Sequence, residues 1–293
     1  MEDRIITYGG QAVIEGVMMR GRAAMAIAMR APDGRIVTHK EKLGSIYRSR
    51  VARIPFLRGV VLLWDALGLG MRALTIAANT QTGEDEKLEG PALYLTLGVA
   101  LLFGIGLFFL LPAGLGSLAE RYLAWNAWWS NVLEGLVRLL LLVGYIWAIG
   151  FLPDIKRVFS YHGAEHKTIN AFEAGAELTP ETVARFPLEH PRCGTAFLLT
   201  LVLFSVLLFS AMGPLPLAWR LISRIVLIPV LAGFSLEYIR WTAAHLNNKF
   251  VRWLIKPNLA LQSLTTREPD SSMLQVAIEA FKTMRQAEQE LAA

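Results

Sequence analysis

The sequence has 293 residues, of which 54% are hydrophobic and 18% charged, and its net charge is +5. This composition is too apolar for an ordinary soluble chain of that length, so a lipid bilayer must cover part of the surface. The single cysteine, Cys193, excludes an internal disulfide. The positive charge does not indicate nucleic-acid binding, because basic loops are expected in membrane proteins and no basic helix or aromatic RNA-binding motif is present.

The N-terminal region, residues 1–54, is predicted to be cytoplasmic and rich in β-structure. Large apolar residues alternate with alanines between positions 24 and 30, and a Pro-Asp-Gly turn follows, which predicts a β-hairpin. The glycine-rich residues 9–21 lack the Lys-Ser/Thr of a phosphate-binding loop, so these glycines are expected in turns and bulges. Residues 1–11 lack the apolar core of a cleaved signal peptide.

Residues 55–89 are predicted to form an amphipathic helix followed by an acidic linker. Polar side chains recur in the helix every seven positions, which places them on one stripe of an otherwise apolar surface: Arg58, Asp65, Arg72 and Asn79. We expect this helix to lie in the membrane interface, because a full span would invert every loop that follows it.

Four apolar segments are long enough to cross a bilayer, whose hydrocarbon core needs ~20 apolar residues in a helix. Two fall in residues 90–153 and two in residues 194–239. They run from Gly90 to Ala119, Val132 to Pro153, Gly194 to Trp219, and Leu221 to Ile239. Four charged residues near the ends of the second and fourth segments are expected to snorkel to the interface: Glu134, Arg138, Arg224 and Glu237. A proline is expected to kink the fourth segment.

Orientation follows from the basic residues, because Lys and Arg are retained on the cytoplasmic side of a membrane. Only four of the 29 lie in or beside the short loops predicted outside: Arg121, Arg138, Arg220 and Arg224. The N-terminal region, a loop of residues 154–193 and a tail of residues 240–293 are therefore predicted to be cytoplasmic, as are both termini. The tail should contain an amphipathic helix that begins after Pro269-Asp270. The expected fold is a mainly α polytopic membrane protein with about four transmembrane helices.

The central loop contains an H-x-x-E-H arrangement in His162, Glu165 and His166. Residues four apart in a helix project from one face about one turn apart, so two such imidazoles can share a metal ion. In inverted zinc peptidases with this pattern, the histidines bind zinc and the glutamate activates the attacking water. The pattern therefore predicts His162 and His166 as metal ligands and Glu165 as the catalytic general base.

Two more residues of metal-binding type, His190 and Cys193, lie where the third membrane segment begins. Cysteine and histidine are favoured ligands of zinc, so these residues are expected to complete a zinc site. A purely structural interpretation stays open, since interfacial histidines also bind headgroups or cap helices and Cys193 can serve as a small core residue. Four protein ligands would make the metal structural, whereas three and a water would leave it reactive.

At these residues the sequence resembles the YqhQ-like family of bacterial integral membrane proteins, which are described as predicted metal-dependent enzymes. Four separated blocks carry the resemblance: Gly9–Gly21, Tyr161–Lys167, His190–Thr195 and Leu264–Pro269. The resemblance implies a bacterial inner-membrane location and metal dependence. The residues that it implicates are His162, Glu165, His166, His190 and Cys193.

Two functions of different class are compatible with the sequence. The first is a membrane-embedded zinc hydrolase that acts on a peptide or lipid near the cytoplasmic face. The second is a non-enzymatic factor that docks on another membrane protein, such as a translocon or a protease, and whose His/Cys cluster is structural. A transporter is disfavoured, because carriers usually place ionisable residues near the bilayer midplane and the two most apolar segments have none.

Overall fold

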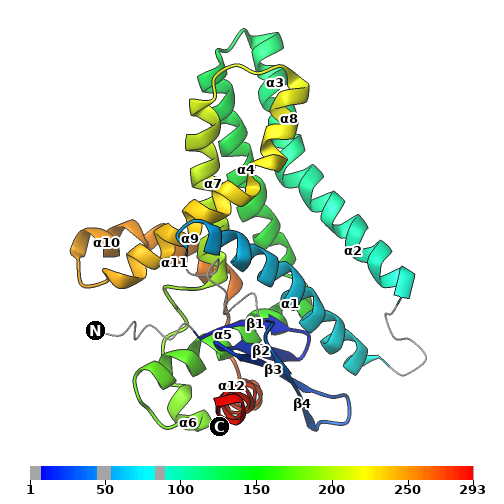
Figure 1. The fold of residues 1–293 in the computed structure, drawn as a ribbon, viewed down its shortest axis with the longest axis vertical. Coiled ribbons are helices and arrows are strands. Elements are labelled where there is room, and N and C mark those ends of the chain that lie inside the picture. Colours follow the sequence, from blue (N-terminus) through cyan, green and yellow to red (C-terminus); the bar gives the residue numbers. More distant parts are fainter. Residues whose placement is uncertain (1–7, 45–53, 83–89, 293) are drawn as a thin grey trace.

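The computed structural model describes residues 8–44, 54–82 and 90–292, and Figure 1 shows its fold. Long helices occupy one end of the molecule, and a small sheet with several helices occupies the other. The predicted fold class, mainly helical with a small N-terminal β-region, is confirmed.

The β-region is an antiparallel sheet whose strand order follows the chain: β1 (Gly9–Val13), β2 (Gly16–Arg20), β3 (Ala24–Arg30) and β4 (Ile36–Lys42). The predicted hairpin is β3 and β4, paired from Ala24 with Lys42 to Arg30 with Ile36. Residues 9–21, whose glycines are expected in turns and bulges, form a second hairpin, β1 and β2, in which Gly9, Gly10 and Gly16 lie within the strands. Gly16 permits the close approach of β2 to β3, since a Cβ atom there would overlap the Ala28 carbonyl of β3.

Both faces of the sheet are covered, which explains why large and small apolar residues alternate along β3. The smaller residues Ala26 and Ala28 face helices α5 (Pro153–Glu173) and α12 (Ser271–Ala292). The larger residues Met25, Ile27 and Met29 face α1 (Leu57–Gln81). The sheet is therefore the middle layer of a three-layer arrangement that can be followed in Figure 1.

Helix α12 begins where the sequence predicts, directly after Pro269-Asp270. The Asp270 side chain accepts a hydrogen bond from the Met273 N–H at 2.9 Å, which caps the helix. Its apolar stripe is buried, and Phe281 packs against the rings of Tyr8 and Phe172 at centroid distances of 5.3 and 4.7 Å. The apolar face that the sequence predicts for the tail helix is thus the face that packs on the sheet layer.

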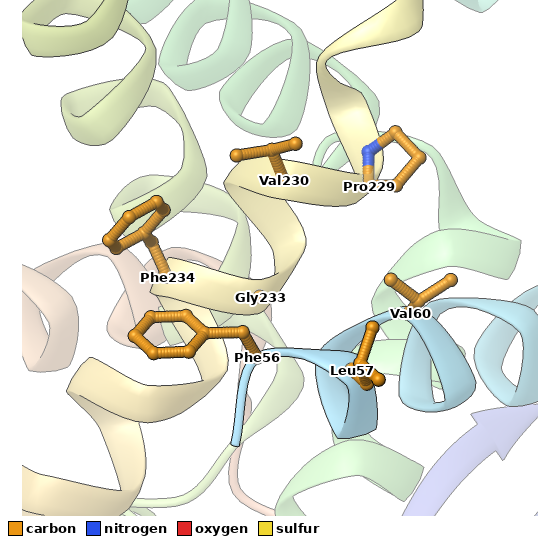
Figure 2. Close-up of a pocket in the computed structure, with 7 residues that line it drawn as sticks. All are labelled: Phe56, Leu57, Val60, Pro229, Val230, Gly233 and Phe234. Atoms are coloured by element: carbon orange, nitrogen blue, oxygen red, sulfur yellow. The ribbon is translucent and has the colours of Figure 1, made fainter. Parts of the chain in front are cut away.

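Helix α1 is confirmed as a helix and packs on α9 (Ile228–Ala244), whereas its position in a membrane interface stays a prediction. Gly59 makes the close approach possible, since a Cβ atom there would lie 2.6 Å from Gly233 Cα. Arg58 forms an ion pair with Glu237 of α9. Beside this contact lies an apolar pocket of about 250 Å³, lined by Phe56, Leu57, Val60, Pro229, Val230, Gly233 and Phe234 (Figure 2).

Within the described residues, three helices are long and apolar enough to cross a membrane, or four if a bent pair counts as one span. The first is continuous over Gly90–Leu123 and comprises α2 (Gly90–Ile105), the π-helical turn η4 (Gly106–Leu110) and α3 (Leu111–Leu123). The others are α4 (Ala127–Ile149), α7 (Gly194–Ala211) and the pair of α8 (Leu217–Val226) and α9, bent by 45°.

The third segment ends earlier than predicted, at Ala211 and not at Trp219. Gly213 adopts a φ of 71°, and two prolines follow within three residues, so the helix cannot continue. The kink expected in the fourth segment is a full break between α8 and α9, next to Pro229 at the start of α9.

The sheet, α5 and α12 lie at the same end of the long helices (Figure 1). The chain leaves this end through α2 and α3 and returns through α4 to α5. It leaves again through α7 and returns through α8 and α9 to the C-terminal helices.

The expectation that the charged residues of these segments snorkel is wrong for Glu134, Arg138 and Arg224, whereas Glu237 is partly exposed in its ion pair with Arg58. Glu134, Arg138, Arg220 and Arg224 are all buried. Glu134 accepts hydrogen bonds from Arg138 and Arg224, each at 2.8 Å. The guanidinium of Arg224 also lies 4.1 Å from the ring centroid of Phe209 on α7. The Glu134 carboxylate compensates part of this positive charge inside the protein, and we call these four residues the Glu134 network.

Replacement of Glu134 by Gln should destabilise the helical end by ~3–5 kcal/mol, because it removes the central anion and leaves buried guanidinium groups without full compensation. The measurement is thermal unfolding of the detergent-purified protein. Glu177→Gln is the matched control, since Glu177 is exposed. Equal unfolding temperatures for the two variants would contradict the assigned role of Glu134.

Candidate metal centre

Two histidines of the candidate site come from one face of α5. The helix begins with Pro153 in its first turn and has Asp154 beside it, both of which favour a helix start. His162 and His166 lie four residues apart, and their ring centroids are 4.3 Å apart. The helical spacing predicted from the sequence is thus present, and both side chains lie largely out of solvent.

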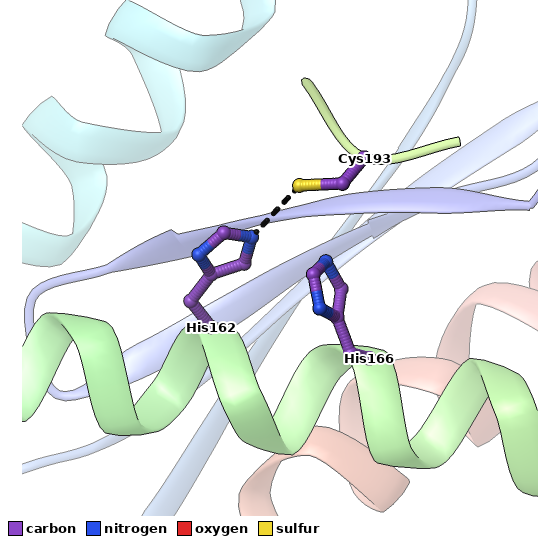
Figure 3. Close-up of side chains that lie close together, drawn as sticks. All are labelled: His162, His166 and Cys193. Carbon is purple, nitrogen blue, oxygen red and sulfur yellow. Dashed lines mark hydrogen bonds between the residues drawn. The ribbon is translucent and has the colours of Figure 1, made fainter. Parts of the chain in front are cut away.

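Cys193 approaches the two imidazoles from a different part of the chain. It is the N-cap residue of α7, and its backbone N–H donates to the His190 carbonyl in a tight turn. The turn brings Cys193 Sγ to 3.2 Å from His162 Nε2 (Figure 3). One ligand atom from each of His162, His166 and Cys193 lies within 4.8 Å of the others.

The other nitrogen of each imidazole is held by a backbone carbonyl. His162 Nδ1 lies 2.9 Å from the Thr265 carbonyl oxygen, and His166 Nδ1 lies 2.5 Å from that of Leu188. A carbonyl oxygen can only accept a hydrogen bond, so Nδ1 must carry the proton in both rings. Each Nε2 is therefore the nitrogen with a lone pair available for a metal when the ring is neutral.

The electrostatics of the cluster favour a thiolate. Burial alone would raise the pKa of the Cys193 thiol, but the hydrogen bonds and charge of His162 and His166 hold that pKa well below its usual range. Burial alone would lower the pKa of His162, but Cys193 and Glu165 outweigh it and raise the pKa to about 9. The thiolate is the form of cysteine that binds metals.

Glu165 lies beside the cluster, on the same helix. Its Oε2 is 3.9 Å from His162 Nε2 and 3.8 Å from His166 Nε2, and its side chain is buried. Strand β1 passes directly over it at Gly10, where a Cβ atom would lie 2.7 Å from Glu165 Cγ. The glycine-rich N-terminal block therefore makes room for this carboxylate.

His190 is buried near the cluster but does not belong to the group of three. Its ring centroid is 5.7 Å from that of His166, and its Nε2 lies 3.7 Å from Glu173 Oε2. Arg192 forms an ion pair with the same glutamate. Of the two residues predicted to complete the site, the structure brings Cys193 to the imidazoles and places His190 beside Glu173.

Two further residues hold the cluster in place. Gln262 of α11 (Lys256–Thr265) exchanges two hydrogen bonds with the His190 backbone, at 2.8 and 3.0 Å. Glu15, at the β1–β2 turn with a φ of 52°, pairs with Arg157 of α5. Glu15 is among the additional polar candidates that the sequence offers, whereas no sequence signal marks Gln262.

Comparisons with known proteins support the family resemblance. A family model described as "Protein of unknown function (DUF1385)" matches residues 54–287. The chain is 36% identical over 301 residues to "Uncharacterized protein YqhQ" of Bacillus subtilis (strain 168), and the match covers 96% of this chain and 93% of that protein. No solved structure matches the chain. The predicted resemblance to YqhQ-like proteins is confirmed, and the descriptions of the matches give no activity.

Gly163, between the two histidines, gives a direct test of the site's packing. A Cβ atom there would overlap the Arg267 carbonyl and lie 2.7 Å from Leu188 Cδ2, so it would displace both segments that hold the imidazoles. Gly163→Ala should therefore lower the free energy of unfolding by about 1–3 kcal/mol in denaturant titrations. Gly144→Ala, where a Cβ atom would meet open space, is the control. If the two variants are equally stable, the packing described at Gly163 is wrong.

Proposed function

Because the chain belongs to the DUF1385 family, whose description assigns no reaction, we propose a function from the site itself: a zinc-dependent hydrolase at the cytoplasmic face of a bacterial inner membrane. Zinc would be bound by His162, His166 and Cys193, with Glu165 as general base. The observation that carries the proposal is the pair of Nδ1-to-carbonyl hydrogen bonds, which leave both Nε2 atoms available beside the Cys193 sulfur.

The donor set fits zinc. Two imidazole nitrogens and one thiolate are favoured zinc ligands, with Zn–N of ~2.0–2.1 Å and Zn–S of ~2.3 Å. Tetrahedral angles then place N and S roughly 3.6 Å apart. His162 Nε2 and Cys193 Sγ, at 3.2 Å, need only a small displacement to reach that separation.

Three protein ligands leave one position of a tetrahedral zinc open, where zinc supplies a Lewis acid and an activated water. Glu165 would accept the proton of the attacking water. Its distances to the two Nε2 atoms support this role, because the carboxylate is close to the ligands and is directed by its packing under Gly10. The reaction that such a site would serve is hydrolysis.

The arrangement of the helices supports a site at the membrane surface. Cys193 immediately precedes α7, a candidate span, and α5 directly follows α4. The sheet, α5 and α12 share one end of the molecule, as expected for four crossings with α8 and α9 as one span. Since the basic residues concentrate in these same parts of the chain, we place this end and both termini in the cytoplasm. The substrate would be a peptide or lipid at that surface.

The metal content of the purified protein tests the proposal. Protein prepared from zinc-replete cells should contain about one zinc per chain, as a single three-ligand site requires. His162→Ala and Cys193→Ser should each abolish most of it, whereas His190→Ala should retain it. Cobalt substitution should give a thiolate-to-cobalt absorption band that Cys193→Ser removes.

The matched control for these histidine variants is His245→Ala, since His245 is exposed and its imidazole hydrogen-bonds only to the Trp241 carbonyl among the described residues. Metal-free wild-type protein would refute the proposal, and so would an equal loss of zinc from His245→Ala.

A second candidate is a non-enzymatic membrane factor with a structural zinc. It is favoured by one observation, that Glu165 is buried and nearly equidistant from both Nε2 atoms, so a modest movement would make it the fourth ligand. Four protein ligands would close the metal to substrate and leave the site a structural support for docking on another membrane protein.

Glu165→Gln separates the two candidates, because glutamine keeps the shape of the side chain but is a poor base and a poor zinc ligand. The hydrolase predicts that zinc affinity stays within a few-fold of wild type, since Glu165 does not bind the metal. The structural site predicts a loss greater than the ~10–100-fold that removal of an outer-shell partner costs, because a direct ligand is removed. Competition with a chromogenic chelator measures the affinity, and Glu177→Gln controls for the loss of one exposed charge.

A further inference from the structure

A long segment without acidic residues begins in α9, at the end of the last candidate span, and continues beyond it. Between Glu237 and Glu268 the sequence has no Asp or Glu, and it has five basic residues: Arg240, Lys249, Arg252, Lys256 and Arg267. The whole chain has a net charge of +5, so this one segment carries as much positive charge as the protein has in excess. Such a segment should attract an anionic surface.

The segment folds into an elbow that projects sideways from the long helices. It consists of α10 (Lys249–Leu254) and α11, which follow α9 and lie apart from the sheet layer (Figure 1). The elbow begins a few residues after α9, so it lies at the end of that candidate span. Its distance from the bilayer surface is therefore set by α9.

One side of the elbow is fastened to the protein. Val251, Ile255 and Leu261 are buried, and the Leu254 carbonyl accepts a hydrogen bond from the Tyr238 hydroxyl at 3.4 Å. The C-terminal end of α11 supplies the Thr265 carbonyl that holds His162. The elbow is thus a fixed part of the fold, and its outward side chains are not needed for its core.

The outward side combines large aromatic rings with cations. Phe250 and Trp253 are 61% and 63% exposed, and their rings stack with centroids 6.0 Å apart. Lys249, Arg252 and Lys256 are exposed beside them, and none of the three takes part in an ion pair with another described residue. Aromatic rings favour the interface of a bilayer, and cations there bind anionic headgroups.

We propose that α10 and the first turn of α11 bind anionic phospholipid headgroups, with Phe250 and Trp253 inserted among the lipids and Lys249, Arg252 and Lys256 on the phosphates. The positive charge of the segment favours an anionic surface. The exposed aromatic pair favours a lipid over a soluble anion, because aromatic rings bind at the interface of a bilayer. The surface does not depend on the zinc proposal, because none of its residues belongs to the metal centre.

Lipid titration of the full chain in neutral detergent tests the proposal. Native mass spectrometry would count bound phosphatidylglycerol and phosphatidylcholine. Phosphatidylglycerol should bind more tightly, with an affinity that falls as salt rises. The triple variant Lys249→Gln, Arg252→Gln, Lys256→Gln should lose on the order of 100-fold in that affinity, because each basic residue near an anionic surface contributes about 1 kcal/mol.

A second triple variant provides a control of equal charge: Lys42→Gln, Arg185→Gln, Lys282→Gln, all exposed and all on the sheet, α12 or the central segment. It should bind phosphatidylglycerol as wild type does. Equal affinity for the two lipids, or an equal loss in both triple variants, would overturn the proposal.

Brominated phosphatidylglycerol in nanodiscs gives an independent measurement. It should quench wild-type tryptophan fluorescence more than that of Trp253→Phe, because bromine on the acyl chains quenches only rings that reach the lipid. No difference between the two proteins would show that Trp253 does not reach the lipid, and it would overturn the proposal. Zinc content should be unchanged in every variant, so failure here and failure of the metal site are distinguishable.

Discussion

Two hydrogen bonds from imidazole Nδ1 atoms to backbone carbonyls fix the orientation of the two histidines in the candidate site. Both carbonyls come from segments distant in the sequence, so these hydrogen bonds depend on the rest of the fold. The Leu188 carbonyl comes from the segment before α7, and the Thr265 carbonyl comes from the end of α11. Three distant parts of the chain must therefore be folded before His162 and His166 acquire a defined tautomer. Gly163 is the point at which these parts meet, because only a residue without a Cβ atom admits the Arg267 carbonyl there.

Helical spacing alone predicts the relation between His162 and His166, because residues four apart share a face in any helix. The choice of Cys193 over His190 is not predictable in that way. It depends on the turn from His190 to Cys193, which makes the cysteine the N-cap of α7 and directs the histidine toward Glu173. The carbonyls of Thr265 and Leu188 leave no signal in a sequence, because every residue has a carbonyl.

The candidate spans can be predicted from apolar runs in the sequence. The position of their charged side chains cannot, for a physical reason. Hydropathy gives the same value to an arginine that reaches water and to one that meets a carboxylate inside the protein. Snorkelling and burial are therefore indistinguishable in sequence, and the Glu134 network appears only when α4 and α8 are placed together. The break between α8 and α9 makes that contact possible, since it turns Arg220 and Arg224 toward α4.

The sheet layer also gives the glycine-rich block a role that its spacing did not reveal. Strand β1 lies over Glu165 at Gly10, and Glu15 binds α5 through Arg157, one turn and a half before His162. The N-terminal strands therefore position the helix that carries both imidazoles, whereas Cys193 is positioned by α7. A metal bound here would join two separately supported bodies, the sheet with α5 and the helices with α7. Any relative movement of those bodies would change the Cys193-to-His162 distance, so the geometry of the site is coupled to the packing of the candidate membrane helices.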